Sequence, residues 1–464
     1  MTDASRKERD SLGECEVPMS AYWGIQTQRA LSNYPISGLT LAFEMVQACA
    51  TIKLAAAKVH GELGMLSPEI AAAVIQASRE VREGRWQDHF VVDAFQAGAG
   101  TSFHMNVNEV IANRSNEILG HERGSYFPVH PNDHVNMGQS TNDVFPTTMR
   151  LAMIVMLTAL GAEAGLLAES FRGKAEEFDG IVKSGRTHLQ DAVPLRLGQE
   201  FGAYAQAIAK GSRRLGAMRE PLYELGIGGS AVGTGLNTHP RYRSRMVAEL
   251  ATLTGFPLRE GEDLFELMQS MTPFADVSAA LRSLALDVTR IASDLRLLSS
   301  GPRTGLAEIS LPAVQPGSSI MPGKVNPSIP EMVNQVCWHV MGADTAVAYA
   351  VQAGQLELNV MMPVMAYELV FAMRIMTNAL KVFRELCVEG IEANAETCRH
   401  FAERSLGLAT VLNPVIGYAE AAEVAKEAFR SQRSVIEVIR ERGELDPEAE
   451  KALSLRAMTE PPTL

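Results

Sequence analysis

The sequence predicts a mostly α-helical protein built around a bundle of long helices. Apolar residues from Phe274 to Leu298 recur every three or four positions, which marks one face of an α-helix. Similar patterns extend over about residues 143–178, 194–225 and 328–389, well beyond the roughly 10–14 residues of a usual globular helix. The apolar–polar alternation of strands is scarce. Long helices joined by short, glycine-bearing loops predict an extended helical bundle.

The composition changes along the chain and predicts its domains. A chain of 464 residues is long enough for two or three domains. Residues 1–140 mix short helices with loops rich in Gly and Asn, which predicts an N-terminal domain. Residues 141–392 carry the long helical patterns and form the central bundle domain. From residue 393 the segments become shorter and more charged, so we expect a small helical C-terminal domain over residues 393–464.

The overall composition excludes some classes of partner. A hydrophobic content of 46% supplies a large core. The net charge of −12 disfavours nucleic acid as a partner. The five cysteines show no paired or metal-ligand spacing, which predicts free thiols in a reducing cytoplasm. The first ten residues are polar, so we expect no signal peptide and a cytoplasmic protein.

One apolar segment is long enough to cross a membrane. Between Glu331 and Glu357 the only acid or base other than histidine is Asp344. The segment also contains several amide side chains and lacks flanking basic clusters. A helix that is apolar on all sides is equally expected in the centre of a large bundle. We therefore predict a helix buried on all sides, and no membrane partner.

The stretch PGSSIMPGKVNP, residues 316–327, is rich in loop-forming residues. A phosphate-binding loop needs four residues between its glycines and Ser or Thr after the lysine. Here five residues separate Gly317 from Gly323, and Val325 follows Lys324. Hydroxyl, ammonium and amide groups gathered in one loop suit a small anion better than a plain surface loop does. These groups belong to Ser318, Ser319, Lys324 and Asn326. We therefore expect a carboxylate site in this loop.

Two polar loops lie before helical patterns nearer the N-terminus. In GAGTS, residues 98–102, glycines allow the backbone to approach a ligand, and a helix is expected from about Asn106. GQSTND, residues 138–143, precedes the long pattern that begins at residue 143. Asn142 or Asp143 could simply cap that helix. The three consecutive small polar residues exceed what one cap requires, so this loop is also a candidate binding site.

Two more polar segments lie within the central domain. GRTHLQD, residues 185–191, places Thr187 and His188 in a polar break between helices. A single loop histidine is more often structural than catalytic. GGSAVGTGLN, residues 228–237, only loosely matches a dinucleotide-binding motif, and no strand precedes it. These segments alone therefore leave their function open.

Taken together, these segments resemble one known family. GSSIMPGKVNP resembles the signature of the aspartase/fumarase superfamily, and GAGTSFHMNVNEVIAN, QSTND, GRTHLQDAVP, GTGLN and GQLELNV resemble its other motifs. The resemblance extends from LGECEVPMSAYWGIQT almost to the C-terminus. It implies a three-domain, mostly α-helical subunit whose long central helices form the core of a homotetramer, with each active site built from three subunits. The implied reaction is reversible β-elimination from a small dicarboxylate, giving fumarate. We expect it to use no cofactor and no metal.

The resemblance also implies roles for individual residues. Ser318 is expected to be the catalytic base, on a loop that closes over the substrate. His188 lies on the leaving-group side and has Glu331 as its partner. Lys324 and Asn326 hold one substrate carboxylate. The other substrate-binding residues are Thr101, Ser140, Thr141 and Ser319 for the second carboxylate, Asn142 on the leaving-group side, and Thr187.

The leaving group separates the possible functions. QSTND, GQLELNV and LRLLSSGPR resemble the aspartase branch, which predicts deamination of L-aspartate to fumarate and ammonia. GGSAVGTGLNTHP and HPNDHVN resemble the fumarase branch, so interconversion of malate and fumarate is the alternative. Met362 stands where aspartases usually have Glu, which leaves a carbon–nitrogen lyase acting on a modified aspartate as a further alternative. A non-catalytic role, as in lens crystallins, is disfavoured because the expected base and anion-binding groups are present.

Overall fold

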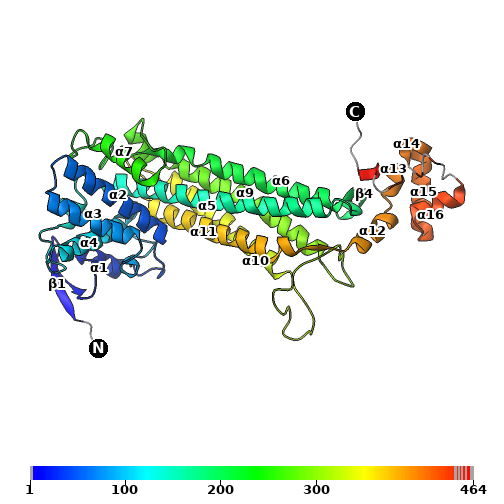
Figure 1. Cartoon of the computed structure of the whole chain (residues 1–464), viewed down its shortest axis with the longest axis horizontal. Coiled ribbons are helices and arrows are strands. Elements are labelled where there is room, and N and C mark those ends of the chain that lie inside the picture. Colours follow the sequence, from blue (N-terminus) through cyan, green and yellow to red (C-terminus); the bar gives the residue numbers. More distant parts are fainter. Residues whose placement is uncertain (1–3, 444–446, 448–449, 451–452, 455–456, 460–464) are drawn as a thin grey trace. The chain divides into compact units, whose positions relative to one another are not determined.

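The computed structural model describes all residues except 1–3, 444–446, 448–449, 451–452, 455–456 and 460–464, and the described chain is mostly α-helical (Figure 1). The α-helices of the described residues are α1 (Ile25–Asn33), α2 (Phe43–Glu62), α3 (Pro68–Arg82), α4 (Thr101–Ile118), α5 (Thr141–Glu177), α6 (Leu197–Ala217), α7 (Tyr242–Thr254), α8 (Leu264–Gln269), α9 (Thr272–Leu298), α10 (Ser328–Gln352), α11 (Met362–Leu386), α12 (Ala395–Arg404), α13 (Leu408–Val411), α14 (Asn413–Ile416), α15 (Tyr418–Ser431) and α16 (Val435–Arg442).

Short elements connect these helices. The strands are β1 (Ser5–Asp10), β2 (Gly13–Pro18), β3 (Val182–Thr187), β4 (Gln190–Arg196), β5 (Glu224–Leu225), β6 (Arg259–Glu260), β7 (Ile309–Ser310) and β8 (Glu392–Ala393). They form two-stranded sheets, of which β1–β2, β3–β4 and β7–β8 are antiparallel and β5–β6 is parallel. The single-turn helices are η1 (Gln87–His89), η2 (Gly98–Gly100), η3 (Pro131–Val135), η4 (Glu220–Tyr223), η5 (Val388–Gly390) and η6 (Ala457–Thr459).

The chain divides into two compact units. The first comprises Met1–Gly161, Arg214–Ser283 and His339–Met376. Within it, α2 packs against α3, α4 and α7 (Figure 1). The sequence of α2 is rich in alanine, and most of its residues are buried. Alanine combines the highest helix propensity with a small side chain, so neighbouring helices can approach α2 closely.

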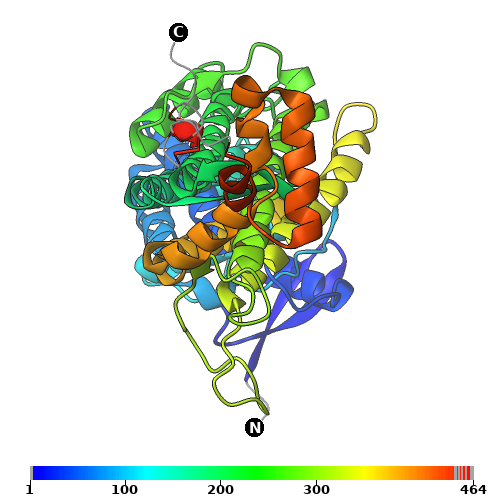
Figure 2. The ribbon, with the colours of Figure 1, turned by 90° about the vertical axis from the view of Figure 1, so that its right-hand side faces the viewer.

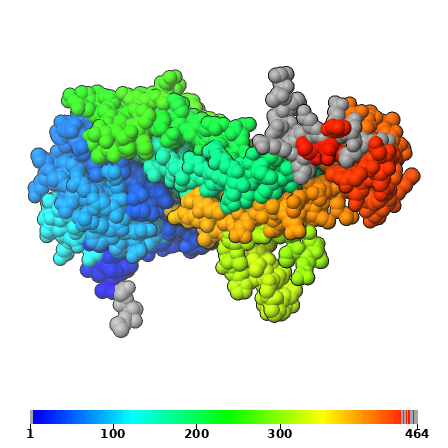
Figure 3. Space-filling model, turned by 45° about the vertical axis from the view of Figure 1, so that its right-hand side comes forward, coloured from blue at the N-terminus to red at the C-terminus, as the bar shows by residue number. Residues whose placement is uncertain are grey.

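The second unit comprises Ala162–Arg213, Leu284–Trp338 and Thr377–Leu464. In it, α12 packs against β3 and α13 packs against β4. Its C-terminal helices, orange to red in Figure 2, share a small apolar core. The long segment between α9 and α10 contains residues 316–327, and it extends away from those helices as an open loop (Figure 1) and a separate yellow-green lobe (Figure 3).

The long predicted helices are confirmed, with two differences in extent. Helices α5 and α9 match the patterns at 143–178 and 274–298. The pattern at 328–389 is not one helix but two, α10 and α11, separated by residues 353–361. In that break Leu356 has a φ of +51°, and the Asn359 side-chain amide donates to the carbonyls of Ala350 and Val351 at 3.0 Å each. The pattern at 194–225 shortens at both ends to α6, because its first residues belong to β4 and its last residues form η4 and β5.

Two β-hairpins were not predicted. Residues 185–191 lie between α5 and α6, as predicted, but they form the turn and the adjoining strand ends of the β3–β4 hairpin. The N-terminal β1–β2 hairpin is also absent from the sequence-based prediction. Neither pair of strands shows a clean apolar–polar alternation in its sequence. Their pairing depends on tight turns and on contacts with other elements, so the primary signal for strands was missing.

The apolar segment after Glu331 is not buried on all sides within one chain. Val333 and Val347 of α10 are buried, whereas Trp338 is 59% exposed and Tyr349 is 70% exposed. This helix therefore has one packed face and one face that carries large exposed rings. Among the described residues, the one helix long and apolar enough to cross a membrane by length and composition is α5, and more than half of its most apolar stretch is buried. A single buried helix of this kind is weak evidence for a membrane span.

Candidate active site

The predicted site residues lie in both units. Thr101, Ser140, Thr141 and Asn142 belong to the first unit, and Thr187, His188, Ser318, Ser319, Lys324, Asn326 and Glu331 belong to the second.

Thr101 is the first residue of α4, which begins five residues before the predicted start at Asn106. The turn before it is tight, because Ala99 and Gly100 both have positive φ, +60° and +87°. A Cβ atom on Gly100 would lie 2.3 Å from the Phe145 ring, so only glycine fits this close approach. The turn leaves Thr101 exposed at the helix N-terminus. Free backbone N–H groups at such a position favour an anion.

Ser140 caps α5, a role that the sequence analysis gave to Asn142 or Asp143 alone. The Asn142 N–H donates to Ser140 Oγ at 3.2 Å, and the Ser140 N–H donates to Asp143 Oδ1 at 3.0 Å. Together these two bonds cap the start of the helix. The cap fixes the backbone of all three neighbouring polar residues at the start of the helix.

The glycine-rich segment after residue 227 supports this helix start. Asp143 is buried, and its Oδ2 accepts from the N–H groups of Gly228 at 2.9 Å and Ser230 at 3.0 Å. The Asn142 side-chain amide donates to the Ala231 carbonyl at 2.7 Å. Burial raises the pKa of Asp143 to about 6, while the N–H donors act in the opposite direction. Residues 228–231 therefore form a structural support for α5 and not a dinucleotide site.

Thr141 is connected to buried polar groups that the sequence analysis missed. Its Oγ1 lies 2.7 Å from Nδ1 of His104, and Nε2 of that ring lies 2.5 Å from Nζ of Lys53. The lysine is fully buried on α2. A lysine inside the apolar, alanine-rich run CATIKLAAA was the available signal, because a lysine is rarely fully buried unless it has partners.

In the second unit, Thr187 and His188 lie at the tip of the β3–β4 hairpin. Thr187 pairs with Gln190, and the two turn residues His188 and Leu189 have positive φ of +55° and +60°. Neither turn residue is glycine, so the turn holds backbone strain of the kind that clusters at functional sites. Both Thr187 and His188 are exposed. The turn therefore presents the imidazole to solvent at the tip of the hairpin.

Buried ion pairs hold the stem of this hairpin. Lys183 on β3 lies 2.7 Å from Glu200 and 3.1 Å from Glu308. Arg186 lies 2.9 Å from the same Glu308, whose side chain is fully buried. Removing one partner of such a network leaves an uncompensated buried charge, which is strongly destabilising. The stem is thus rigid, although its tip is exposed.

The loop at residues 316–327 holds Ser318 in a distinctive environment. Ser318 Oγ accepts from the backbone N–H of Met321 at 2.9 Å and from that of Ile320 at 3.2 Å. Two N–H donors directed at one oxygen stabilise negative charge on that oxygen. This arrangement suits a serine that must give up its proton to act as a base.

The two ends of this loop are tied together. The Gly317 N–H donates to the Lys324 carbonyl at 2.8 Å, and the Asn326 amide donates to the Gly317 carbonyl at 2.5 Å. A Cβ atom on Gly317 would lie 2.4 Å from the Lys324 carbonyl oxygen. The loop therefore closes on itself at its base and leaves Ser318 to Lys324 as a protruding segment.

Lys324 and Asn326 line a hollow within the second unit. The hollow has a volume of about 560 Å³, and its other lining residues include Arg296, Ser300 and Asn394. Two cationic side chains and several hydroxyl and amide groups around one hollow suit a carboxylate ligand. Ser318 does not line this hollow. The structure thus brings the two predicted carboxylate ligands together and places the predicted base elsewhere on the same loop.

Glu331 lies in the first turn of α10 and is half-buried. Across the described part of the chain, its carboxylate makes no hydrogen bond or ion pair with His188. The structure of one chain therefore does not bring this predicted pair together. Across the same described residues, no group of three or more His, Cys, Asp or Glu side chains could hold a metal ion.

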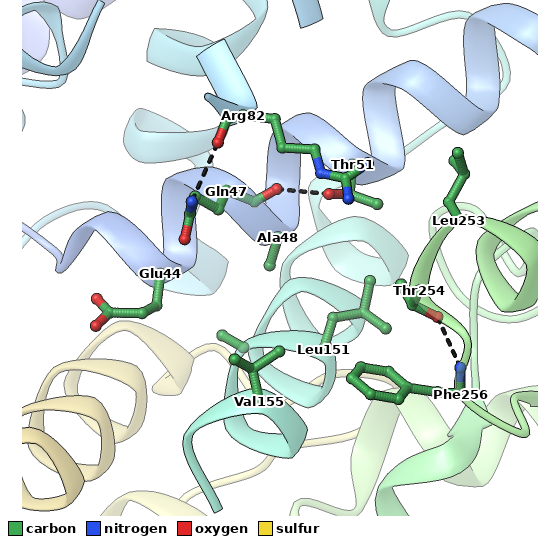
Figure 4. Close-up of a pocket in the computed structure, with 11 residues that line it drawn as sticks. Glu44, Gln47, Ala48, Thr51, Arg82, Leu151, Val155, Leu253, Thr254 and Phe256 are labelled. Carbon is green, nitrogen blue, oxygen red and sulfur yellow. Dashed lines mark hydrogen bonds between the residues drawn. The ribbon is translucent and has the colours of Figure 1, made fainter. Parts of the chain in front are cut away.

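Another cavity lies in the first unit, away from the predicted residues. It has a volume of about 240 Å³ and lies between α2, α3, α5 and α7, with Leu151, Val155 and Phe256 among its apolar walls (Figure 4). Its acidic residue, Glu44, forms an ion pair with Arg374. The cavity contains none of the predicted catalytic or binding residues, so it is not the candidate active site.

Comparison with known proteins identifies the family of this chain. A family described as lyase matches residues 13–342, and a family described as fumarase C C-terminus matches residues 408–460. The chain is 47% identical over 443 residues to an aspartate ammonia-lyase from a Bacillus species, covering 96% of this chain and 95% of that protein. It is 48% identical over 462 residues to a class II fumarate hydratase from Halobacterium salinarum, covering 99% and 98%.

A solved structure agrees over nearly the whole chain. The fumarate lyase:delta crystallin from Brucella melitensis, bound to cobalt, superimposes with a TM-score of 0.95 at 47% identity, covering 99% of this chain and 100% of that one. The site and the comparisons therefore define a lyase. This chain belongs to the aspartase/fumarase superfamily, and the expected family resemblance is confirmed.

Proposed function

We propose that this protein is an aspartate ammonia-lyase, which converts L-aspartate reversibly to fumarate and ammonia. The observation that carries the proposal is the geometry of the 316–327 loop, where two N–H donors hold Ser318 Oγ and the same loop presents Lys324 and Asn326 to a hollow. Two relatives that match more than 90% of this chain are named aspartate ammonia-lyase, and they support the choice of substrate.

The first chemical step removes a proton from Cβ of the substrate. That proton is too weakly acidic for an unaided side chain, so the charge that develops on the adjacent carboxylate must be stabilised. In our proposal Lys324 and Asn326 bind that carboxylate. The Ile320 and Met321 N–H groups lower the cost of ionising Ser318, which takes the proton. The electron pair of the C–H bond then resides on the aci-carboxylate.

The second step breaks the Cα–N bond. The electron pair returns from the aci-carboxylate to form the Cα=Cβ double bond of fumarate, and the amine leaves with the electrons of the C–N bond. In our proposal Asn142, Thr187 and His188 surround the leaving amine, and Glu331 orients the imidazole. Thr101, Ser140, Thr141 and Ser319 bind the other carboxylate. Closure of the 316–327 loop would exclude water from the reacting atoms.

The proposed assembly is a homotetramer whose sites each combine residues from three subunits. Its support is the exposed apolar surface of the long helices, including Trp338, Tyr349 and Leu286. Large exposed apolar side chains on one helix face are typical of an interface. The division into domains at 1–140, 141–392 and 393–464 belongs to the same proposal. We also propose a cytoplasmic location, in keeping with five free cysteines.

A substrate assay tests the leaving group. Ammonia and water differ little in size, so hydrogen-bond polarity must discriminate between them. We expect L-aspartate to give fumarate, which is measured by its absorbance. The kcat/KM for L-aspartate should be at least about 10²-fold above that for L-malate. Class II fumarate hydratase is the second candidate, because one relative of equal identity carries that name. Faster turnover of L-malate would establish the second candidate instead. Turnover of neither would direct the search to modified aspartates, beginning with substitutions of Met362.

Complementation tests the shared site. Thr101→Ala and Ser318→Ala subunits are unfolded, mixed and refolded together. If residues of different chains build one site, some mixed tetramers contain a site with no substituted residue, so activity rises above that of either variant. Native mass spectrometry verifies that mixed tetramers form. Mixed tetramers with no recovered activity would show that each site lies within one chain.

A further inference from the structure

A chain of buried polar groups in the first unit reaches Thr141 but contains no residue of the predicted site. It begins at Lys53 on α2, whose side chain is fully buried, and continues through His104 on α4, which is 1% exposed. A buried lysine is costly unless its ammonium group is hydrogen-bonded. The partners of Lys53 therefore determine its effect on the neighbouring ring.

Three acceptors surround the ammonium group of Lys53. Nζ lies 2.8 Å from Gln139 Oε1, 3.0 Å from Asn136 Oδ1 and 2.5 Å from His104 Nε2. An ammonium group has three N–H donors and no acceptor. The three donors and three acceptors match in number, so Lys53 is fully satisfied in its charged form.

Backbone carbonyls fix the orientation of the two amide side chains. The Gln139 amide nitrogen donates to the carbonyls of Val135 at 3.1 Å and Met137 at 3.2 Å. The Asn136 amide nitrogen donates to the Gln139 carbonyl at 3.3 Å. Each amide oxygen must therefore face Lys53. Exchanging the oxygen and nitrogen of either amide would lose both its bond to Lys53 and its bonds to backbone carbonyls.

The same contacts fix the tautomer of His104. Because Lys53 can only donate, Nε2 of the ring must accept, and the ring proton must lie on Nδ1. Burial, with a further contribution from Lys53, holds the pKa of His104 well below its ordinary value, so the ring is neutral. Burial also lowers the pKa of Lys53 to about 8, which leaves the ammonium form dominant at neutral pH. Nδ1–H then donates to Thr141 Oγ1 over 2.7 Å.

This donation determines what the Thr141 hydroxyl can do. Its oxygen already accepts from His104, so its own proton must point to another acceptor. Within the described residues, the Thr141 hydroxyl makes no second hydrogen bond. We propose that Lys53 and His104 are positioning residues that keep the Thr141 hydroxyl as a hydrogen-bond donor toward a substrate carboxylate. This inference rests on the proposed function, in which Thr141 contacts the substrate.

A double-mutant cycle separates this role from a merely structural one. We expect His104→Phe and Thr141→Val each to lower kcat/KM for L-aspartate by about 10- to 100-fold, as for loss of a hydrogen bond to a charged group. If His104 acts through the Thr141 hydroxyl, the double variant should be no slower than the slower single variant. Losses that multiply in the double variant would overturn the proposal.

Three further variants guard against simple misfolding. In His104→Gln, the side-chain oxygen can accept from Lys53 while the amide nitrogen donates to Thr141, so we expect most of the activity to return. If His104→Phe does not fold, the cycle uses His104→Ala in its place.

The matched control is His60→Phe on the same helix as Lys53, because His60 is buried and stacks on Tyr242 with a centroid separation of 4.7 Å. We expect that control to keep the parental kcat/KM. Equal losses in His60→Phe and His104→Phe would also contradict the positioning role.

Neutron diffraction from a crystal of the full-length protein tests the hydrogen bonds from Lys53 through His104 to Thr141 without using turnover. We expect deuterium on Nδ1 of His104, none on Nε2, and three deuterons on Nζ of Lys53. Deuterium on Nε2 would overturn the positioning role of Lys53 and His104 and leave the proposed function intact. Conversely, the expected deuterium pattern in a protein that turns over no dicarboxylate would overturn the proposed function and, with it, the substrate contact of Thr141.

Discussion

The two parts of the candidate site differ in how firmly their side chains are held. In the first unit, Thr141 is bound to a buried ring and Asp143 accepts from three backbone N–H groups. In the second unit, Ser318 and Lys324 lie on a protruding loop, and His188 lies at a hairpin tip. We infer that the groups for a stationary carboxylate are fixed before substrate arrives, whereas those that act on the reacting atoms are carried by backbone that can move.

Burial explains why the difference can persist. A buried polar atom without a partner costs about 1–3 kcal/mol, so the first unit tolerates few alternative arrangements of its polar groups. An exposed loop has no such constraint, because water can replace any lost partner. Substitutions in the loop should therefore change activity with little effect on stability, and substitutions in the buried region should change both.

The largest expected effect tests the loop. Ser318→Ala should lower kcat by at least about 10²–10⁴-fold, the range for loss of a general base. The unfolding temperature should not change, because among the described residues Ser318 Oγ bonds only to neighbours in its own loop. Kinetics and thermal unfolding are measured together, with Ser431→Ala on α15 as an exposed serine control. A kcat within about threefold of the parent would remove Ser318 from the role of base.

Lys324→Met should have the next largest effect. A charge-assisted contact to a carboxylate contributes about 1.5–3 kcal/mol, so kcat/KM should fall by roughly 10- to 150-fold. Part of the loss should appear in kcat, because charge on the bound carboxylate grows in the transition state. The matched control, Lys426→Met on α15, makes the same change in net charge at an exposed position that pairs with Glu423. Equal kinetics for the two variants would exclude Lys324 from the site.

The smallest expected effect compares two glycines with nearly the same backbone conformation. Gly100 in the first unit has a φ of +87°, and Gly323 in the loop has a φ of +80°. An added Cβ atom meets Phe145 at 2.3 Å in the first case and no atom within 4 Å in the second. An alanine at either position pays a similar conformational cost for its positive φ. Gly100→Ala also forces a clash with Phe145, so it should lose about 1–3 kcal/mol more stability than Gly323→Ala.

Denaturant unfolding of both variants measures this difference. If Gly323→Ala proved equally destabilised, the loop would be packed as tightly as the buried region, and the comparison between the two regions would fail.

Much of the helical architecture could be predicted, because its signals are local. The apolar repeat that forms α9 lies within one segment, and the predicted pattern and the helix agree almost residue for residue. The anion-binding character of residues 316–327 was also visible, since its hydroxyl, amide and ammonium groups are close in sequence. The β3–β4 hairpin was missed because its strands lack alternation, and its stem depends on Glu308, which lies far away in the sequence.

The sequence by itself determined the family, the long helices and the residue types available for β-elimination, because each of these is encoded in short, contiguous motifs. Only the tertiary structure decided which groups meet. His104 and Gln139 lie 51 and 86 positions from Lys53 in the sequence, and nothing in the local sequence of the three residues indicates that they touch one another. Packing of α2 against α4 brings Lys53 and His104 together, and burial then requires that every donor find an acceptor. That requirement fixes the tautomer of the ring and the direction of the Thr141 hydroxyl.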